Sequence, residues 1–519
     1  MNINRILIAF LALIAATSTV SCHKDRGNYD HLTLAPMEID VEGVPQSYTL
    51  LRFDTLTIRP KVRYGGVTVD PADAKLPQLE FSWEMYPAQI DREIIERHTL
   101  SDSIALHAEM NQRELTWEVL FTVTDKETGV KAFSKFNVAI TPALAEGWMV
   151  LYERNGATDV GIISNNDISK TQVAERVFMD VYSASNGAPL RGTPGSIIYS
   201  TANMPGRMKL YVQSSEDIAS INLNTFERVA SFDDGLFWTR PAVAAPALVT
   251  ATPSRKEFLI NDNRLHVLDY TVIAPGDRAF NDALGGSYGM LAPWIATATS
   301  PAFEAILYDQ TNQRFMKVMQ RGSEVVPIST VQSEGTPFDV NEVGMELIFA
   351  DLGWNNWEHM VMRDTYGGHY LLTANFMEGE TAFIGKGKYD MNTCPDIGNI
   401  NAIAAGYFGE VFYYSANASL YQFRYTPGAT EMLWTAPEGQ TITDIALQKY
   451  YNTNRAAGVL FDPKNLCRIL YIATYNEATR TGTVYQMEVN PSSGAIIAGT
   501  EKSYSGFGKI KAMGWKPFL

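Results

Sequence analysis

A pattern that recurs between residues 147 and 519 constrains this chain more than any other feature. An apolar alternating stretch, a tight turn and a second apolar stretch follow one another every 45 to 55 residues, roughly, which is the spacing of a repeat architecture. Residues 257–260, for example, lead through the turn Asn261-Asp262-Asn263 into residues 265–270. Period-two alternation broken by turn residues predicts antiparallel hairpins. We therefore predict a β-propeller of about seven four-stranded blades.

The ends of this region support a closed repeat. The stretch Lys509–Trp515 has the same strand-like pattern as the stretch that begins near Trp148. We expect the last strand of the chain to complete the blade that the first strand begins, because closure leaves only short sheet edges.

The turn Asn261-Asp262-Asn263 has alternating oxygen ligands, so a calcium-binding loop is an alternative to a hairpin turn there. An EF-hand loop, however, has twelve residues and ends in an acidic residue, which is missing here. A hairpin turn is the better interpretation.

Composition agrees with an all-β globular protein. Hydrophobic residues make up 46% and charged residues 19% of the 519 positions, which is typical of a chain that folds. Aromatic residues at 11%, with 38 glycines and 24 prolines, favour short strands joined by turns. The formal net charge of −15 repels polyphosphate, so nucleic acid is not expected as a partner.

The first 21 residues have the pattern of an export signal. Arg5 precedes an apolar stretch over residues 6–16, and a run of small polar residues leads to Cys22. That apolar stretch has about eleven residues, whereas a membrane span needs about 20. Ser21 before Cys22 resembles the lipobox of bacterial lipoproteins, with Thr19 where leucine is commoner. We predict cleavage and diacylation at Cys22, so that the membrane is reached through lipid alone. An ordinary secretory signal with an incidental cysteine is the alternative.

Residues 22–30 are short and polar, and we interpret them as a tether. From residue 31 to residue 143 the pattern predicts a small β-sandwich with Trp83 in its core, because alternating stretches at 79–85 and 117–123 precede a turn and a further strand. Asp125 lies in that turn and is expected to be structural.

Several ordered landmarks resemble the PKD-like lipoproteins of Bacteroidetes. They are residues 25–30, 81–83, 123–125 with Gly129, 146–151, 181–187 and 190–194. The resemblance implies an immunoglobulin-like PKD module over 31–143 and a repeat β domain over 147–519. It also implies SusC/SusD-like outer-membrane partners, an outer-membrane location, and the cell surface rather than the periplasmic face. Only Asp25, between Lys24 and Arg26, represents the acidic run that often marks surface display.

No motif predicts a catalytic residue, a metal site or a cofactor. The seven histidines lack metal-ligand spacing, so His359 and His369 are expected to be ordinary strand or loop residues. Neither a nucleophile elbow nor a phosphate-binding loop is present. Cys394 and Cys467 are expected to be separate buried thiols, with a disulfide as the alternative. A hydrolase or lyase stays open, because sequence does not give the distance between two carboxylates.

Two tryptophans in a polar stretch predict a ligand site. Trp354 and Trp357 stand among Asn355, Asn356 and Glu358, and the face of a sugar packs on an aromatic ring while amides and carboxylates bind its hydroxyls. The alternative is that these tryptophans fill gaps between blades. Further candidates are Trp238 beside Asp233 and Asp234, Trp294, and Tyr450-Tyr451-Asn452.

These features predict a non-enzymatic, lipid-anchored envelope protein. Its expected task is to bind a nutrient ligand, preferably a glycan, and to pass it to a SusC/SusD-like transporter. One alternative is a scaffold that binds only the transporter proteins, which a propeller surface supports equally well. A propeller-type polysaccharide hydrolase or lyase is the second alternative, and capture of a peptide is also open.

Overall fold

The computed structural model describes most of the chain. The described residues are 34–69, 78–89, 96–141, 144, 146–170, 175–200, 208–252, 256–270, 279–296, 302–328, 335–379, 383–449 and 464–517. Strands account for 56% and helices for 4% of the structure, so the predicted all-β class is confirmed. Among the described residues, none of the helices has the length and hydropathy needed to cross a membrane. The predicted signal peptide and Cys22 lie outside the described residues.

The chain forms two compact units. Unit 1 comprises Met1–Tyr48, Leu56–Ala108 and Thr116–Val138, and unit 2 comprises Thr49–Thr55, Glu109–Leu115 and Ala139–Leu519. The first ten strands are β1 (Met37–Asp40), β2 (Ser47–Leu51), β3 (Thr55–Ile58), β4 (Lys61–Tyr64), β5 (Val67–Val69), β6 (Leu79–Pro87), β7 (His98–Ser101), β8 (Leu106–Glu109), β9 (Thr116–Asp125) and β10 (Lys131–Thr141).

In this first part of the chain, the period-two pattern of the sequence becomes alternating burial. The sheet runs β2-β10-β9-β6-β7, and β1, β4 and β5 form a second sheet. Trp83 of β6 is fully buried and stacks on Phe121 of β9 at a centroid distance of 4.4 Å. The Asp125 carboxylate accepts hydrogen bonds from the amide of Glu127 at 2.9 Å and from the hydroxyl of Tyr64 at 2.9 Å. Its predicted role as a turn residue is confirmed.

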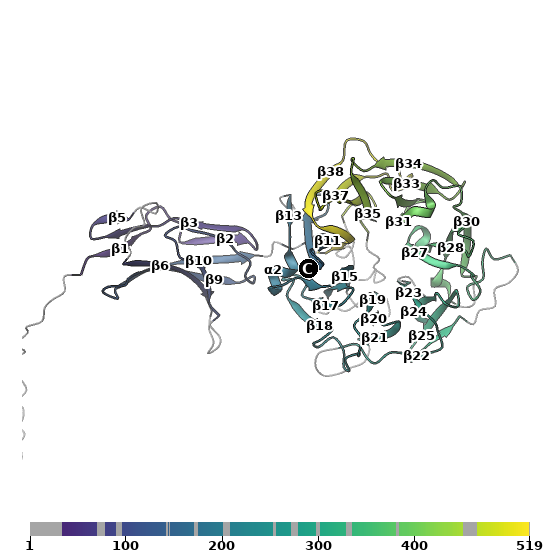
Figure 1. Cartoon of the computed structure of the whole chain (residues 1–519), viewed down its shortest axis with the longest axis horizontal. Coiled ribbons are helices and arrows are strands. Elements are labelled where there is room, and N and C mark those ends of the chain that lie inside the picture. The colour runs from purple at the N-terminus through teal and green to yellow at the C-terminus, as the bar shows by residue number, and fades with distance from the viewer. Residues whose placement is uncertain are drawn as a thin grey trace, which may run out of the picture. The chain divides into compact units, whose positions relative to one another are not determined.

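Unit 2 consists almost entirely of small antiparallel sheets. Within the described residues there are seven, and Figure 1 shows them following one another around a ring. In chain order they are β11 (Gly147–Arg154), β12 (Ala157–Ser164), β13 (Arg176–Phe178) and β14 (Leu190–Arg191) with β39 (Lys509–Lys516); β15 (Pro194–Ser200), β16 (Lys209–Ser214), β17 (Ile218–Ile221) and β18 (Arg228–Ser231); β19 (Pro246–Thr252), β20 (Lys256–Asn261) and β21 (Arg264–Asp269); β22 (Gly285–Gly286), β23 (Leu291–Ile295), β24 (Phe303–Asp309), β25 (Arg314–Met319) and β26 (Glu324–Pro327); β27 (Glu346–Leu352), β28 (Glu358–Arg363), β29 (His369–Ala374) and β30 (Gly385–Asp390); β31 (Ile400–Ala405), β32 (Phe412–Ala416), β33 (Ser419–Arg424) and β34 (Ala429–Thr435); and β35 (Gln440–Leu447), β36 (Ile469–Asn476), β37 (Thr481–Glu488) and β38 (Lys502–Phe507).

The last strand of the chain belongs to the first sheet of unit 2. β39 pairs antiparallel with β11, and Trp148 lies opposite Trp515 in the register. The expected completion of the first sheet by residues 509–515 is therefore confirmed. The sheet edges that face the centre of the ring are β15, β19, β23, β27, β31, β35 and β39, which we call the inner strands; β39 and β15 are neighbours, as are β35 and β39.

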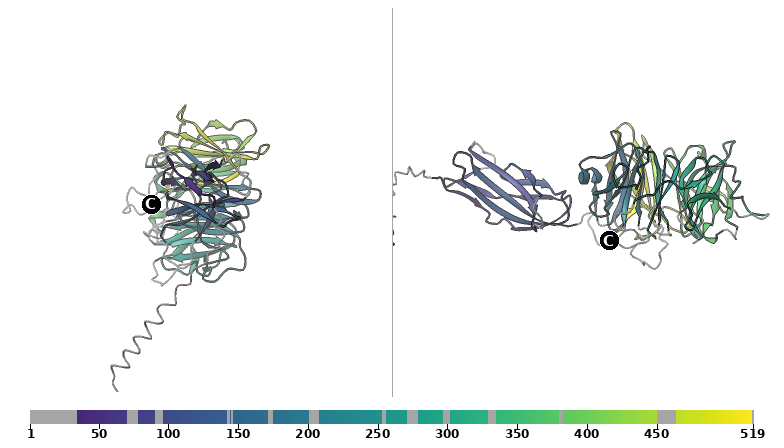
Figure 2. Two further views of the ribbon diagram at one scale, coloured as in Figure 1. Left: turned by 90° about the vertical axis from the view of Figure 1, so that its left-hand side faces the viewer. Right: turned by 90° about the horizontal axis from the view of Figure 1, so that it is seen from below.

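Apolar clusters between adjacent sheets form the core of unit 2. Trp148 of β11 stacks on Tyr471 of β36 with a centroid distance of 3.9 Å, and both side chains are fully buried. Burial of one such aromatic side chain contributes about 2 to 3 kcal/mol. Because each sheet packs against the next, the clusters hold neighbouring inner strands together. Figure 2 shows the same sheets from two further sides.

Turn residues behave as the sequence predicts. Asp262 and Asn263 have positive φ angles of 47° and 55° and connect β20 to β21 in a tight hairpin. The hairpin interpretation of this turn is confirmed. The only α-helix among the described residues is the short α2 (Val181–Asn186). Cys394 and Cys467 are both buried and free.

Candidate functional site

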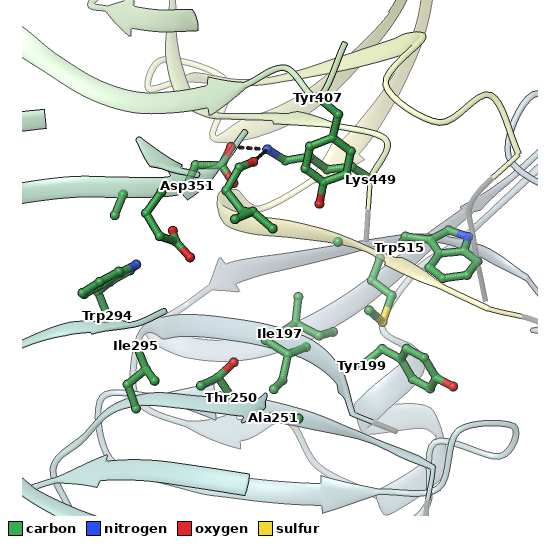
Figure 3. A pocket seen from close by; sticks show the side chains of 16 residues that line it. Ile197, Tyr199, Thr250, Ala251, Trp294, Ile295, Asp351, Tyr407, Lys449 and Trp515 are labelled. Atoms are coloured by element: carbon green, nitrogen blue, oxygen red, sulfur yellow. Dashed lines mark hydrogen bonds and ion pairs between the residues drawn. The ribbon is translucent and has the colours of Figure 1, made fainter. Parts of the chain in front are cut away.

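A pocket opens where the inner strands end. It has a volume of about 300 Å³, and we call it the central pocket. Each contributing inner strand supplies residues from its carboxyl half: β15, β19, β23, β27 and β39 give, for example, Tyr199, Thr250, Trp294, Asp351 and Trp515. Figure 3 shows these side chains around one space. The ring therefore brings together residues that are far apart in the sequence.

Lys449 holds one wall of the central pocket. Its ammonium donates to the Oδ2 of Asp351 and to the carbonyl oxygens of Leu352 and Ala405, each at 2.6 Å. The same Oδ2 accepts a hydrogen bond from the amide of Ala405 at 2.7 Å. Two backbone carbonyls and one carboxylate satisfy the three donors of this largely buried ammonium, and the carboxylate neutralises its charge. Lys449 thus fixes the end of β27 against the end of β31 and the segment that follows it.

The other walls of the central pocket combine aromatic, apolar and acidic groups. Trp294 is partly buried and packs against Phe315 and Phe376, with centroid distances of 6.0 Å and 6.1 Å. Tyr407 lies beside Lys449, whose Nζ is 5.1 Å from the centre of its ring. Figure 3 shows Trp294 and Tyr407 on different walls, with Ile197, Thr250 and Ile295 between and below them. Such walls suit a ligand that has an apolar ring face and polar edges.

Glu358 is the acidic residue that the sequence and the structure both select. It begins β28, is 2% exposed and lines the central pocket. The polar stretch that the sequence analysis selected, Trp354 to Glu358, lies between two strands and enters the second of them. Asp351 and Leu352 end β27, and Glu358 and His359 begin β28, so only residues 353–357 form the loop.

The five residues before Glu358 form the β27–β28 hairpin loop. Asn355 and Asn356 have φ angles of 63° and 58°, a left-handed conformation that asparagine tolerates better than most residues. This backbone requirement explains the two amides at this place. Trp354 and Trp357 are partly buried and do not line the central pocket.

The remaining predicted ligand residues fall in different places. Trp294 lines the central pocket, whereas Trp238 is 59% exposed and lies between β18 and β19, outside that pocket. Residues 450–452 lie outside the described residues. Tyr407 and Lys449 line the pocket although the sequence analysis did not select them. Tyr407 follows β31 and Lys449 follows β35, the first strands of their sheets. The sequence could have indicated them by this position, because residues just after the first strand of each repeat lie at the same end of the ring.

His359 is a structural residue. Its Nδ1 lies 2.9 Å from the carbonyl oxygen of Trp357, and its Nε2 lies 3.1 Å from the hydroxyl of Tyr425. Burial lowers the pKa of His359 to about 4, the Trp357 carbonyl opposes this effect and the charge of Lys449 adds to it. The ring is therefore neutral near pH 7 and hydrogen-bonded at both nitrogens. Within the described parts of the chain, no group of three or more His, Cys, Asp and Glu side chains is arranged to hold a metal ion.

Asp444 lies on the inner strand β35 and is partly buried. Burial raises the pKa of Asp444 to about 7; the charge of Lys511 and the backbone amides of Ile445 and Met513 oppose this effect, and the carboxylate of Asp351 adds to it. The pKa of Asp444 therefore depends on two charges. One is Asp351, which lines the central pocket, and the other is Lys511, near the amino end of β39.

Comparison with known proteins identifies the amino-terminal part of the chain. Residues 22–194 match the PKD-like family. This part of the chain is similar to that family. The match confirms the resemblance over these residues, which reach the first residue of β15. They include β11 and its partner β12 but not its other partner, β39. A search of curated proteins gives no match.

Solved structures give distant similarities. A quinonprotein alcohol dehydrogenase-like protein from Bacteroides thetaiotaomicron is 12% identical, with 93% of this chain and 99% of that chain covered and a TM-score of 0.48. The extracellular domain of a putative one component system from B. thetaiotaomicron is 8% identical, with coverages of 80% and 65% and a TM-score of 0.36. The WD40 domain of SCAP from fission yeast is 7% identical, with coverages of 60% and 74% and a TM-score of 0.34. At these values the similarities establish no function for this chain.

Proposed function

We propose that unit 2 is a seven-bladed β-propeller whose central pocket binds a carbohydrate without transforming it. The observation that carries the proposal is the pocket itself, in which two indoles, two phenol rings and two carboxylates line about 300 Å³. That volume lies at the lower end of the range for small-molecule sites. It suits one or two sugar units, whose ring face packs on Trp294 while Glu358 accepts hydrogen bonds from hydroxyl groups.

The envelope location is the second part of the proposal. The lipobox-like sequence before Cys22 supports a diacylated amino terminus that holds the protein on the outer membrane, with the cell surface favoured over the periplasmic face. The PKD-like match over 22–194 supports a protein of the envelope, and SusC/SusD-like proteins are the proposed recipients of the ligand. A lipid anchor keeps the pocket close to a transporter and raises its effective concentration there.

Isothermal titration calorimetry of the mature chain against a panel of oligosaccharides tests the binding function. We expect a glycan that binds in the absence of other proteins, and we expect Trp294→Ala to weaken it at least tenfold. Trp238→Ala and the double variant Trp354→Ala/Trp357→Ala decide between the central pocket and the two other tryptophan sites. Tyr366→Ala removes a 97% exposed aromatic ring and serves as the control.

Other outcomes, with two further assays, would support the alternative functions. If no glycan binds but SusC/SusD-like proteins co-purify with the chain, the scaffold function replaces the proposed one. Release of reducing ends from a polysaccharide would instead indicate a hydrolase or lyase. Full binding by Trp294→Ala together with loss in the Trp354→Ala/Trp357→Ala variant would move the site to the β27–β28 loop.

A further inference from the structure

A second, larger cavity lies at the other ends of the inner strands. Its volume is about 670 Å³, and we call it the polar cavity. Pro194, Ile400 and Lys509 line it, and they are the first residues of β15, β31 and β39. The central pocket is lined from the carboxyl halves of inner strands, which include β15 and β39. The two cavities therefore lie toward opposite ends of shared inner strands.

The polar cavity presents hydrogen-bonding groups that are not used within the protein. The side chains of Asn399, Asn417 and Thr441 are exposed and make no hydrogen bond with another described residue. The hydroxyl of Thr443, also in the lining, is buried and has no partner among the described residues. Buried hydroxyls are nearly always hydrogen-bonded in native proteins, so this hydroxyl takes its partner from outside the chain, either a water or a ligand.

One positive charge in the polar cavity is uncommitted. Lys509 donates to Glu477 at 3.0 Å, whereas the exposed ammonium of Lys511 forms no ion pair with a described residue. The charge of Lys511 acts on Asp444, whose carboxyl has its pKa raised to about 7 by burial and is mostly protonated below that pH. At mildly acid pH Lys511 is therefore available to an anion.

The lining also indicates which anion fits. The polar cavity contains amides, hydroxyls, the two ammonium groups of Lys509 and Lys511 and the carboxylate of Glu153, but no aromatic ring. It therefore offers hydrogen bonds and charge in place of a stacking face. A carboxylate placed on a polyhydroxy ring matches that set, because the ammonium binds the carboxylate while the amides and hydroxyls bind the ring hydroxyls. A cavity of about 670 Å³ admits one or two such rings.

We propose that the polar cavity is a second binding site, separate from the central pocket, and that it takes a carboxylate-bearing sugar of the uronic acid class. Lys511 pairs with the carboxylate, and Thr443 with Asn417 binds neighbouring hydroxyls. The site does not depend on the central pocket, and it gives the chain two ends with different ligand chemistry.

Titration of the full mature chain at pH 6 with D-glucuronate and with D-glucose tests this site. The two probes share their ring hydroxyls and differ only in the carboxylate, so we expect glucuronate to bind at least tenfold more tightly. Lys511→Gln is expected to remove this preference, and Thr443→Val to weaken binding severalfold. Lys511→Arg should retain most of the preference, because the charge remains.

Two variants separate this site from its surroundings. Lys509 lines the same cavity but is already paired with Glu477. Lys509→Gln should therefore change the affinity for glucuronate less than threefold. Trp294→Ala should leave glucuronate binding unchanged, since that residue lines the central pocket. Equal affinity for both probes, an unchanged preference in Lys511→Gln, or loss of glucuronate binding in Trp294→Ala alone would each overturn the proposal. Thermal unfolding of every variant checks that it is folded.

Discussion

Lys449 shows how a single buried charge can organise a pocket. The ion pair with Asp351 is 11% exposed at the lysine and 25% at the aspartate. A buried pair of this kind adds little to stability over an apolar equivalent, but removal of one partner leaves a charge that has lost its solvation and its counterion. The pair therefore acts mainly to hold the ends of β27 and β31 at one distance.

The ion pair is tested by a double-mutant cycle. We expect Lys449→Met to lower the free energy of unfolding by about 3 kcal/mol, because the Asp351 carboxylate is left without its cation. The double variant Lys449→Met/Asp351→Asn should recover at least half of that loss. Urea denaturation of the parent chain, Lys449→Met, Asp351→Asn and the double variant gives the four values of the cycle. Strictly additive losses would mean that Lys449 acts through its carbonyl contacts alone.

Asp444 predicts a pH dependence of stability. Its pKa is raised from 3.8 to about 7 in the folded chain. Between pH 4 and pH 7 the unfolded chain has lost this proton while the folded chain keeps it, so stability falls as the pH rises through that window. Above pH 7 the whole penalty applies, and below pH 4 it is absent.

Asp444→Asn should remove this penalty, because the amide resembles the protonated acid. We expect the variant to be about 2 kcal/mol more stable than the parent chain at pH 8 and equally stable at pH 4. Chemical denaturation across this pH range measures the difference, and Asp234→Asn, at an exposed position, is the control. The same offset at every pH would show that Asp444 is not the titrating group.

At the scale of elements, a turn links two sheets. Asn263, in the β20–β21 hairpin, donates from Nδ2 to the carbonyl of Gly289 at 2.8 Å, and its Oδ1 accepts from the amide of Leu291 at 2.5 Å. Leu291 begins β23 of the next sheet. One side chain at a positive φ angle therefore ties a hairpin to its neighbour around the ring.

Two substitutions separate the backbone role of Asn263 from its side-chain role. Asn263→Gly keeps the left-handed conformation but loses both hydrogen bonds, so it should cost about 1 to 2 kcal/mol. Asn263→Ala should cost about 1 kcal/mol more, because alanine is strained at that φ angle. Asp262→Gly, next to it, should stay within about 0.5 kcal/mol of the parent chain. Equal losses for the glycine and alanine variants would argue against backbone strain.

The sequence predicts the strands well and the central pocket poorly, for physical reasons. Strands such as β6 and β9 are visible because one face of each is buried, which imposes an alternating pattern on neighbouring residues. The central pocket instead takes residues such as Thr250, Tyr407 and Lys449 from separate repeats, and no local pattern connects them. From the sequence, Trp294 was selected as an aromatic ring on which a sugar could pack, and Glu358 as an acidic residue next to Trp357.

At the scale of the whole molecule, the first sheet of unit 2 depends on the last strand, β39. β39 pairs with β11 along its length, and Ile510 and Trp515 of β39 are buried in the cluster that also contains Trp148. β39 also neighbours β35 and β15, the inner strands on either side. The first sheet therefore cannot form fully until the end of the chain has been synthesised, which makes its contacts highly non-local.

Removal of residues 509–519 tests this dependence. The deletion exposes the inner edge of β11 and the apolar face that Trp515 covers, so we expect loss of at least about 5 kcal/mol and of a single cooperative unfolding transition in calorimetry. A synthetic peptide of the same residues, added in trans, should bind and restore the transition, because it can pair with the open edge of β11. The same peptide with Ile510→Ala and Trp515→Ala is the matched control, since it keeps the backbone groups but not the buried side chains. A truncated chain that unfolds like the intact one would mean that the remaining strands hold unit 2 together without β39.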